Sequence, residues 1–495
     1  MRVLALGTRR KSCGAREARI YALARVARSA YICVSPRSAY ICVSPRSAKL
    51  VHAAALPRLF LSQTLTQKIM EAIYQFLWQH TMLGRRLSDA DGHVIDILDP
   101  GRLNTDSGPD FFNAKIKIDG TEWIGNIEIH VKASDWYRHH HDSDPAYDNV
   151  ILHVVGVSDR RVTRRDGVSI PQVVTTPPPD FFNLYNQLSN HPAYLRCAPR
   201  LTQLPQIAVT DWLESLAMER IQMKSLRVCD ILRSVANDWE QACFITLARA
   251  LGFGLNGDPF EMLARSLPLR ILHHHSDNPL QLQALLFGQA GMLDQSQHIF
   301  DEFYQLLCRE YYFLARKYGL HPMRPGLWKY ARTRPQNFPH RRIAMLAKVC
   351  EGGFAMLGKL VDCIKEGREI RELFKWRLEG YWHDHFSFDV DAKGGSDVLS
   401  TASVSLLIIN AVVPLVYTFA STRGEYELVE KVLSIMEQLP GESNSIIREW
   451  EGYGLKSGNA LRSQALLHLR REYCEARKCL YCRFAHHYLR HSLHR

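Results

Sequence analysis

The chain has 495 residues, of which 46% are hydrophobic and 23% are charged, so it is long enough for two or three globular domains and too apolar for a disordered protein. Its formal net charge is +12, but residues 1–69 contain thirteen of the basic residues and a single acid, Glu17. Residues 70–495 therefore carry 49 basic and 49 acidic residues and are neutral. The basic total thus does not mark the folded part as a nucleic-acid-binding surface.

Residues 1–69 do not have the pattern of a folded domain. Ser29–Arg46 is a tandem copy of one nine-residue sequence, and the Arg-rich, acid-poor composition is shared with organelle transit peptides. Helical periodicity begins only near Met70, which would be a natural initiator. We expect residues 1–69 to be disordered or to lie upstream of the true start, with a targeting signal as the alternative.

From Met70 the apolar spacing predicts a helix to Thr81, followed by a series of strands. Asp119-Gly120 is a strong signal for a hairpin turn between two of these strands. The last long run is apolar throughout, which is typical of a strand in the middle of a covered sheet. The predicted strands are His93–Leu98, Phe112–Ile118, Trp123–Lys132, Asn149–Val157 and Ile170–Thr175.

A Pro-rich stretch, Thr176–Asp180, marks a domain boundary near residue 180, and helical periodicity takes over from Thr210. We therefore predict an α+β chain: a small mixed-sheet domain at 70–180, a large all-α domain at 181–470, and a Cys-rich segment at 471–495. The predicted helices are Asp211–Ser234, Asp238–Leu251, Pro259–Leu267, Pro279–Leu293, Ser296–Tyr318, Arg341–Cys363, Leu399–Thr422 and Tyr426–Leu439, with Ser457 and Asn459 as candidate caps of a last one.

The cysteines and the most apolar run of the sequence indicate in which cellular compartment the protein works. The nine cysteines after residue 69 form no paired framework, which favours a reducing compartment and a cytoplasmic protein. The run Val404–Ala420 includes Ser405, Asn410 and Pro414 and is barely long enough to span a bilayer. We expect a buried core helix there and no membrane partner.

Acidic, imidazole and amine side chains gather between Asp110 and His153. Because side chains alternate along a strand, Glu128, His130 and Lys132 share one face at intervals of about 6.6 Å. Asp110 begins the neighbouring strand and can reach the same face, although a turn-capping role is an equal alternative. Two carboxylates on adjacent strands beside a base suit a hard divalent cation, Mg²⁺ or Mn²⁺, and an activated water.

A histidine run, His139-His140-His141, follows that strand, and His153 lies inside the next one. Such a run is most often a solvated loop, and a histidine on an apolar strand is more often a hydrogen-bonded core residue. The alternative is a transition-metal site with Glu128, His130, His139, His141 and His153 as ligands. That site requires several imidazoles within about 4–5 Å of one point.

Three cysteines, Cys474, Cys479 and Cys482, lie within nine residues near the end of the chain. Thiolates at this spacing suit Zn²⁺ or an iron–sulfur cluster. Each needs a fourth ligand, which His486 or His487 could provide for zinc and Cys197 for a cluster. Ordinary reduced thiols are the alternative.

Pro109-Asp110 followed by Glu128-Ile129-His130, in a helix–strand–hairpin–helix–strand order, resembles the PD-(D/E)XK nuclease superfamily over about Met70–Val157. The resemblance implies a restriction-endonuclease-like fold in which Asp110 and Glu128 hold Mg²⁺. His130 then stands where the superfamily usually has a lysine, and Lys132 could supply the missing amine. Some nucleases of that superfamily tie the chain ends together with one remote and three C-terminal cysteines, which is similar in outline to Cys197, Cys474, Cys479 and Cys482.

Over most of Met70–Cys482 the chain also resembles a bacterial family of uncharacterised proteins, a domain of unknown function. This resemblance transfers no activity, but it supports a start near Met70. The matching segments are residues 108–111, 125–130, 134–136, 148–155, 334–339 and 479–482.

The leading functional prediction is a metal-dependent nuclease in which Asp110, Glu128, His130 and Lys132 act on a phosphodiester through a metal-bound water. The helical domain would bind the nucleic acid or another partner, and the sequence does not fix the oligomeric state. A catalytically inactive interaction scaffold is the alternative, favoured by the histidine at the lysine position. An open basic cleft around the acids would favour the enzyme, and a buried or acidic pocket would favour the scaffold.

Overall fold

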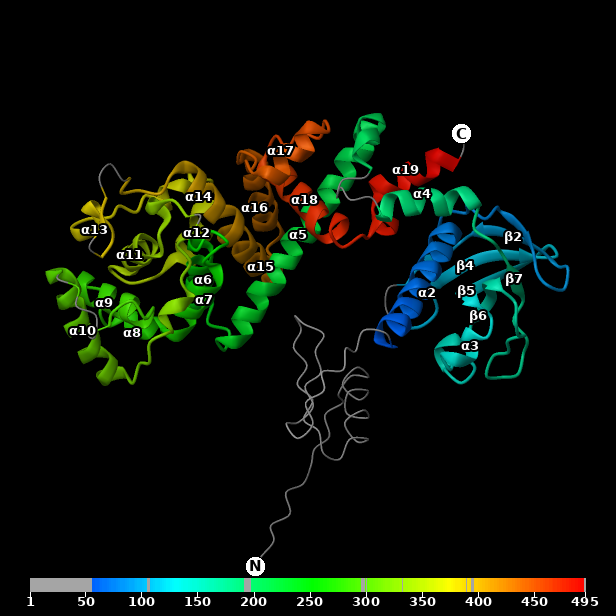
Figure 1. Cartoon of the computed structure of the whole chain (residues 1–495), viewed down its shortest axis with the longest axis horizontal. Helices are drawn as coiled ribbons and strands as arrows, with labels where there is room; N and C mark the ends of the chain where they lie inside the picture. The colour runs from blue at the N-terminus through cyan, green and yellow to red at the C-terminus, as the bar shows by residue number, and fades with distance from the viewer. Residues whose placement is uncertain are drawn as a thin grey trace, which may run out of the picture. The chain divides into compact units, whose positions relative to one another are not determined.

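The computed structural model describes residues 56–104, 107–190, 197–294, 299, 301–331, 333–388, 390–392 and 396–493 (Figure 1). The chain divides into two compact units, with the division after Phe182, close to the predicted boundary at residue 180. The first unit is built on a mixed sheet and the second is almost entirely helical. The α+β fold class is therefore confirmed.

The sheet of the first unit has the strand order β1-β2-β4-β5-β6-β7, with the short β3 paired to β4. Strands β1, β2, β4 and β5 pair antiparallel, whereas β6 pairs parallel with both β5 and β7. The parallel step from β5 to β6 passes through α3 and a short 3-10 turn, η1, and this connection carries the histidine run. The bounds are β1 Arg86–Ser88, β2 Val94–Asp99, β3 Arg102–Leu103, β4 Phe111–Ile118, β5 Thr121–Lys132, α3 Asp135–Arg138, η1 Pro145–Tyr147, β6 Val150–Val157 and β7 Gln172–Val174.

The strands lie where the sequence predicts them, with ends that differ by a few residues at most. Asp119 and Gly120 have φ angles of 48° and 84°, the left-handed conformation that a two-residue hairpin between β4 and β5 requires, so this predicted turn is confirmed. Strand β6 lies between two others and is buried from Val150 to Val155. It is the covered strand that its apolar run predicts.

Helix α2 (Leu56–Gln79) packs on the sheet against β5 and buries Ile73, Leu77 and Trp78. It begins at Leu56 instead of Met70, so it extends into the segment that we expected to be disordered or upstream of the start. The side chain of Gln67 donates a hydrogen bond of 2.7 Å to Asp135 Oδ2, which ties this end of the helix to the sheet unit. Residues 1–55 lie outside the described part of the chain, and our expectation for them stays a prediction.

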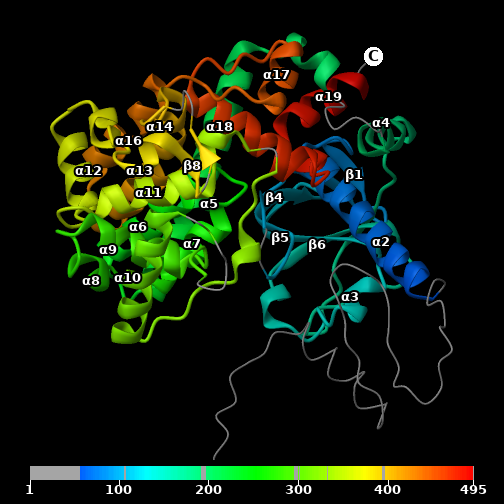
Figure 2. The same ribbon diagram turned by 60° about the vertical axis from the view of Figure 1, so that its left-hand side comes forward.

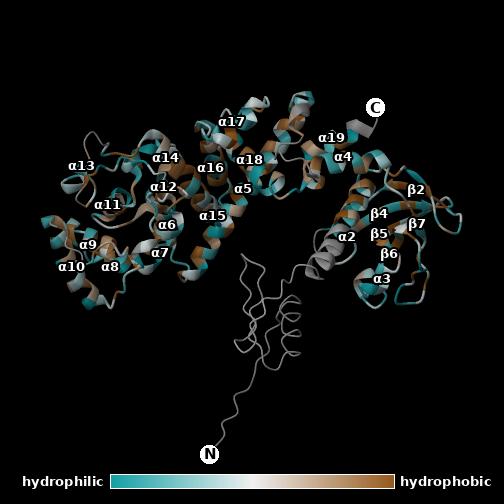
Figure 3. Ribbon diagram, viewed as in Figure 1, coloured by the Kyte–Doolittle hydropathy of each residue, from teal (hydrophilic) through white to brown (hydrophobic). Residues whose placement is uncertain are grey.

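Where the structure describes it, the second unit is helical apart from a small hairpin, β8 (His385–Ser387) with β9 (Val390–Asp391) (Figure 2). Hydrophobic residues concentrate in the inner strands of the sheet and in the helices around α15 and α16 (Figure 3), in line with the two separate cores. The longer helices are α4 Pro179–Asn190, which spans the division, α5 Gln206–Ser234, α6 Trp239–Leu251, α7 Gly257–Ser266, α9 Pro279–Gln289, α10 Glu302–Tyr318, α11 Pro339–Cys350, α12 Met356–Lys365, α15 Val413–Arg423, α16 Tyr426–Gln438, α17 Ser445–Gly452, α18 Ala460–His468 and α19 Arg483–Leu493.

One predicted helix, Arg341–Cys363, is wrong as a single element. It is broken into α11 and α12, because Gly352 and Gly353 adopt φ angles of 70° and 96° that end a right-handed helix.

A second predicted helix, Leu399–Thr422, is present but changes its pitch. After α14 (Thr401–Leu407) the chain forms a π-helical turn, η6 (Ile408–Val412), before α15. Pro414 has no N–H to donate to the preceding turn, which favours the wider turn. By length and composition alone the stretch Thr401–Arg423 could cross a membrane, but most of it is buried within the unit, as in a core helix.

The last part of the helical unit contains another π-turn. Asn459 caps α18 by accepting a hydrogen bond from Arg462 N–H, as predicted, and α18 continues into η7 (Leu469–Cys474). The 3-10 turn η8 (Cys479–Tyr481) and α19 follow.

Candidate metal-binding site

Two carboxylates meet where β4 begins and β5 passes it. Asp110 Oδ2 accepts a hydrogen bond from the N–H of Ile129 at 3.0 Å, and Glu128 Oε2 accepts one from the N–H of Asp110 at 3.0 Å. The antiparallel pairing of Phe111 with Ile127 brings the two acids side by side. The structure therefore places Asp110 and Glu128 together, as the alternation of the strands predicts.

Helix α2 adds two polar side chains to this pair. Gln75 Nε2 donates to Asp110 Oδ1 at 2.8 Å, and Glu71 lies one helical turn earlier on the same face. Burial raises the pKa of Glu71 to about 7, with further contributions from the negative charges of Asp110 and Asp135. The sequence analysis missed Glu71 and Gln75, although a Glu and a Gln four residues apart beside the apolar stripe of a helix were a usable signal.

Burial also raises the pKa of the other two acids. It raises the pKa of Glu128 to about 8, opposed by the Asp110 N–H hydrogen bond and reinforced by Glu71. The pKa of Asp110 lies well above its usual value, first because of burial and then because of Glu128. Three acids are thus held close together, and among the described residues none of the three forms an ion pair with Lys or Arg.

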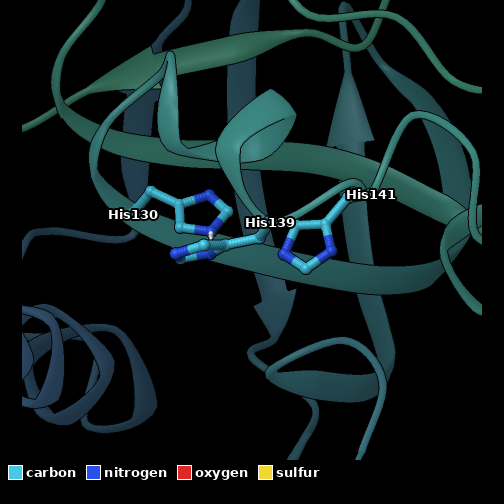
Figure 4. Close-up of side chains that lie close together, drawn as sticks. All are labelled: His130, His139 and His141. Atoms are coloured by element: carbon cyan, nitrogen blue, oxygen red, sulfur yellow. Dashed lines mark hydrogen bonds between the residues drawn. The ribbon is translucent and has the colours of Figure 1, made fainter. Parts of the chain in front are cut away.

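The imidazoles converge on the other oxygen of Glu128. Glu128 Oε1 lies 3.2 Å from His141 Nε2 and 3.5 Å from His130 Nε2. His130 Nε2 is in turn 3.2 Å from His139 Nδ1, and His130 Nδ1 is 2.8 Å from His153 Nε2. One ring nitrogen from each of His130, His139 and His141 lies within 4.8 Å of the others (Figure 4).

Local structure explains why these histidines meet. His130 and His153 lie on the neighbouring parallel strands β5 and β6, where Glu128 pairs with His153. His139 ends α3, and His140 has a positive φ of 62°, so the chain turns and brings His141 back while the His140 side chain stays exposed. The rings of His141 and Tyr147 then stack with centroids 3.8 Å apart.

The imidazoles are in the form that binds metals. Burial lowers the pKa of His141 to about 4 and that of His153 to about 3, and it lowers the pKa of His139 and, strongly, that of His130. They are therefore neutral near pH 7, with ring nitrogen lone pairs free to bind a cation. His153 Nδ1 is buried and has no hydrogen-bond partner among the described residues. This set of neutral imidazoles and carboxyl oxygens fits a divalent transition ion.

Lys132 is the one predicted site residue of this strand that the structure does not bring to the cluster. Its side chain is exposed, and it lies near Asp159, whose pKa it helps to lower. The basic side chain beside the cluster is Arg138. Its Nη2 lies 3.5 Å from His139 Nε2 and 2.9 Å from Asp135 Oδ1. The acids are buried and do not line an open basic cleft. The predicted arrangement that the geometry matches is the one in which several imidazoles converge.

The four cysteines predicted as ligands lie in the helical unit, close enough to affect one another's pKa values. Among the described residues, the group of candidate metal ligands whose atoms lie within 4.8 Å of one another is still that of His130, His139 and His141. Cys197 precedes the 3-10 turn η2 (Ala198–Gln203), far in sequence from Cys474, Cys479 and Cys482. Burial raises the pKa of the Cys197 thiol, and Cys482 and Cys479 raise it further. Burial and the other three thiols likewise raise the pKa of Cys474. The four thiols are thus electrostatic neighbours, and all four are free of disulfides.

The comparison with protein families decides the membership of this chain. The family described as "Protein of unknown function (DUF2851)" matches residues 71–445. The chain belongs to the DUF2851 family. The DUF2851 match begins at Glu71 and includes Asp110, Glu128, the four clustered histidines and Cys197, whereas Cys474, Cys479 and Cys482 follow its end. No curated protein and no solved structure matches the chain.

Proposed function

We propose that this chain is a metal-dependent hydrolase of phosphodiester bonds, with nucleic acid as its substrate class. The observation that carries the proposal is the position of Glu128 Oε1 within 3.5 Å of two imidazoles that share a cluster with a third. Glu128, His130, His139 and His141 would hold the cation, with His153 against His130. Imidazole ligands favour Mn²⁺ or Zn²⁺ over Mg²⁺.

The chain's own residues divide the remaining tasks. Gln75 and the N–H of Ile129 hold the Asp110 carboxyl in place, so Asp110 and Glu71 can take a proton from a water that enters beside the cluster. A bound divalent cation supplies positive charge that activates such a water and offsets the charge on the phosphate. Arg138, exposed next to His139, is placed to orient an anionic substrate.

Two observations support a phosphodiester as the substrate. The order α2, β2, β4, β5, α3, β6 agrees with the order that the PD-(D/E)XK resemblance implies, with Asp110 and Glu128 on adjacent strands. Arg138 also places a guanidinium group beside His139, where it could contact a phosphate. The burial of the acids, the histidine at the lysine position and the distant Lys132 instead favour the scaffold. A cleavage assay separates the two.

The test is a cleavage assay with the full chain on single- and double-stranded DNA and RNA oligonucleotides, with Mn²⁺, Zn²⁺ or Mg²⁺ added. Metal-dependent cleavage that is lost in Asp110→Asn and His141→Ala supports the hydrolase. His140→Asn is the matched control, because His140 is exposed in the same loop and Asn tolerates its positive φ. A folded chain that binds metal without cleaving any of these substrates would favour the scaffold.

We also propose that Cys197, Cys474, Cys479 and Cys482 hold a soft metal centre, either Zn²⁺ or an iron–sulfur cluster. The mutual influence of the four thiols on their pKa values supports this, as does the indole N–H of Trp212, which lies against Cys482 and lowers its pKa. This N–H has no conventional hydrogen-bond partner among the described residues and would suit a metal-bound sulfur as acceptor. Such a centre would join the C-terminal segment to the start of the helical unit.

A further inference from the structure

A cavity of about 650 Å³ lies in the helical unit, and its ionisable lining is dominated by cations. Arg220, Lys224 and Arg227 come from α5 at a spacing that places them on one helix face. Arg249 comes from α6 and Arg471 from the π-turn η7. Glu442 is the one acid among the lining residues, so the cavity carries a large excess of positive charge.

Three cations of this cavity, Arg220, Lys224 and Arg471, lack negatively charged partners among the described residues. Lys224 Nζ donates to Asn410 Oδ1 and to Gln464 Oε1, each at 2.8 Å, and Arg220 Nε also donates to Gln464. These partners are neutral amides. Within the described part of the chain, Arg220, Lys224 and Arg471 form no ion pair with a carboxylate, whereas Arg227 and Arg249 both pair with Glu261.

The lowered pKa values of Arg220 and Lys224 reflect burial and the repulsion between these cations. Arg220 is only 6% exposed, and its pKa falls to about 10, first through burial and then through the charge of Arg471, against the opposing charges of Glu442 and Glu472. Burial, followed by Arg220, lowers the pKa of Lys224 well below its usual value. Arg220 is buried and Lys224 half-buried, and like charges held close without a carboxylate partner are costly. An anion in the cavity would relieve that cost.

The walls of the cavity indicate more than a bare ion. Both π-turns of the unit border it, because η6 contributes Asn410 and η7 contributes Arg471, and π-turns occur frequently at functional sites. Apolar side chains, including Val228, Ile231 and Phe253, line another part. The volume lies within the range of about 300–1,000 Å³ that is usual for small-molecule pockets.

We propose that this cavity binds a small phosphate-bearing organic ligand. The phosphate lies between Arg220, Lys224 and Arg471, and the organic part lies against Val228, Ile231 and Phe253. This inference is independent of the proposed hydrolase activity, since every residue it uses belongs to the helical unit and none to the acid and histidine cluster.

Calorimetric titration of the full chain with pyrophosphate, with sulfate as the competing anion, tests the inference. We expect saturable binding that sulfate displaces poorly, and binding about 10- to 100-fold weaker in Lys224→Met and in Arg471→Met, since each change removes one charge-assisted contact. The matched control is Lys431→Met, an exposed lysine of the same unit outside the cavity. It should bind like the wild type.

Two variants keep the test decisive. Lys224→Met removes a half-buried charge, and Arg471→Met changes an exposed side chain, so we do not expect both variants to unfold. The absence of saturable pyrophosphate binding, or equal affinity in the wild type and both variants, would overturn the inference. Binding of an oligonucleotide but not of pyrophosphate, lost in the same variants, would also overturn it and assign the cavity to nucleic acid.

Discussion

The two units of this chain gather ionisable groups of opposite kind in their interiors. The sheet unit holds Glu71, Asp110 and Glu128 together beside neutral imidazoles, and no Lys or Arg among the described residues pairs with these acids. The helical unit holds Arg220 and Lys224 beside neutral amides, with Glu442 as the one acid that lines the cavity. Burial opposes ionisation in each cluster: it raises the pKa of the three acids and lowers that of Arg220 and Lys224.

This comparison indicates which unit would bind a cation and which would bind an anion. Buried charges are normally paired or bound to metals, and an unpaired group costs several kcal/mol by general estimates. We therefore propose a cation for the acid and histidine cluster and an anion for the basic cavity. The neutral total of residues 70–495 conceals both, because the charges are sorted between the units instead of being absent.

The largest expected effect comes from Glu128→Gln. This change removes the carboxylate that both His130 and His141 approach, so we expect the rate of metal-dependent cleavage to fall by about 1,000-fold or more. Glutamine keeps the shape of the side chain and can still accept the hydrogen bond of the Asp110 N–H, so the variant should fold. Cleavage kinetics together with thermal unfolding measure both points, and wild-type rates in the folded variant would contradict the assigned role.

The next effect concerns the cysteines. Elemental analysis and a visible spectrum of anaerobically purified chain should show either zinc or iron with a brown chromophore, and Cys479→Ser should lose most of it. Because a structural metal contributes directly to folding, we expect the variant's free energy of unfolding to drop by several kcal/mol. Cys229→Ser, outside the cluster, is the matched control. A well-folded wild type without either metal would rule out the centre.

A smaller effect is a pH dependence of the metal-free sheet unit. Because the folded-state pKa values of Glu71 and Glu128, about 7 and 8, exceed the ordinary 4.5, the folded state retains protons that the unfolded chain releases. Stability therefore falls as pH rises from 4.5 toward 8, by roughly 1.4 kcal/mol per pH unit for each such group. The lowered pKa values of His141 and His153 act oppositely, but only below about 6.5.

Between pH 6.5 and 8 the pH dependence of stability therefore reports on the acids and not on the histidines. Denaturant unfolding of the metal-free chain should show a loss of stability across this window, and saturating Mn²⁺ should abolish the loss. The loss should also be smaller in Glu128→Gln. Stability that rises across the window, with or without metal, would contradict a buried acid cluster.

The smallest effect is Lys224→Met in the absence of ligand. Removing a half-buried ammonium group whose hydrogen-bond partners are neutral should raise the free energy of unfolding of the helical unit by about 1 kcal/mol. For the wild type, the burial penalty is present below the lowered pKa of Lys224 and disappears as pH rises toward the ordinary value of 10.5. The gain from Lys224→Met should thus shrink at high pH. A destabilised variant would show that the amides alone satisfy the ammonium group.

Much of the fold follows from local patterns in the sequence. Period-two alternation located β4 and β5, the apolar run located β6, and Asp119-Gly120 fixed the hairpin between β4 and β5. The break between α11 and α12 was missed, because the apolar spacing continues across Gly352 and Gly353. The π-turns were missed as well, because each is a short, wider stretch within an otherwise regular helix.

The site was predictable where strands determine it and not where tertiary packing does. Alternation placed Glu128 and His130 on one face, and the hairpin brought Asp110 beside them. Alternation also placed Lys132 on that face, but the strand's end carries it out to solvent near Asp159. Glu71 joins the cluster through the packing of α2 on the sheet: its spacing from Gln75 puts both on one helix face, but only this long-range contact brings that face to the acids.

The measurement that tests the central claim most directly is calorimetric titration of Mn²⁺ and Zn²⁺ into the metal-free full chain carrying Cys479→Ser, which silences the cysteine centre. The account predicts one saturable site whose affinity falls at least tenfold in His141→Ala and in Glu128→Gln and is unchanged in His140→Asn. Absence of saturable binding, or the same affinity in all of these variants, would contradict it.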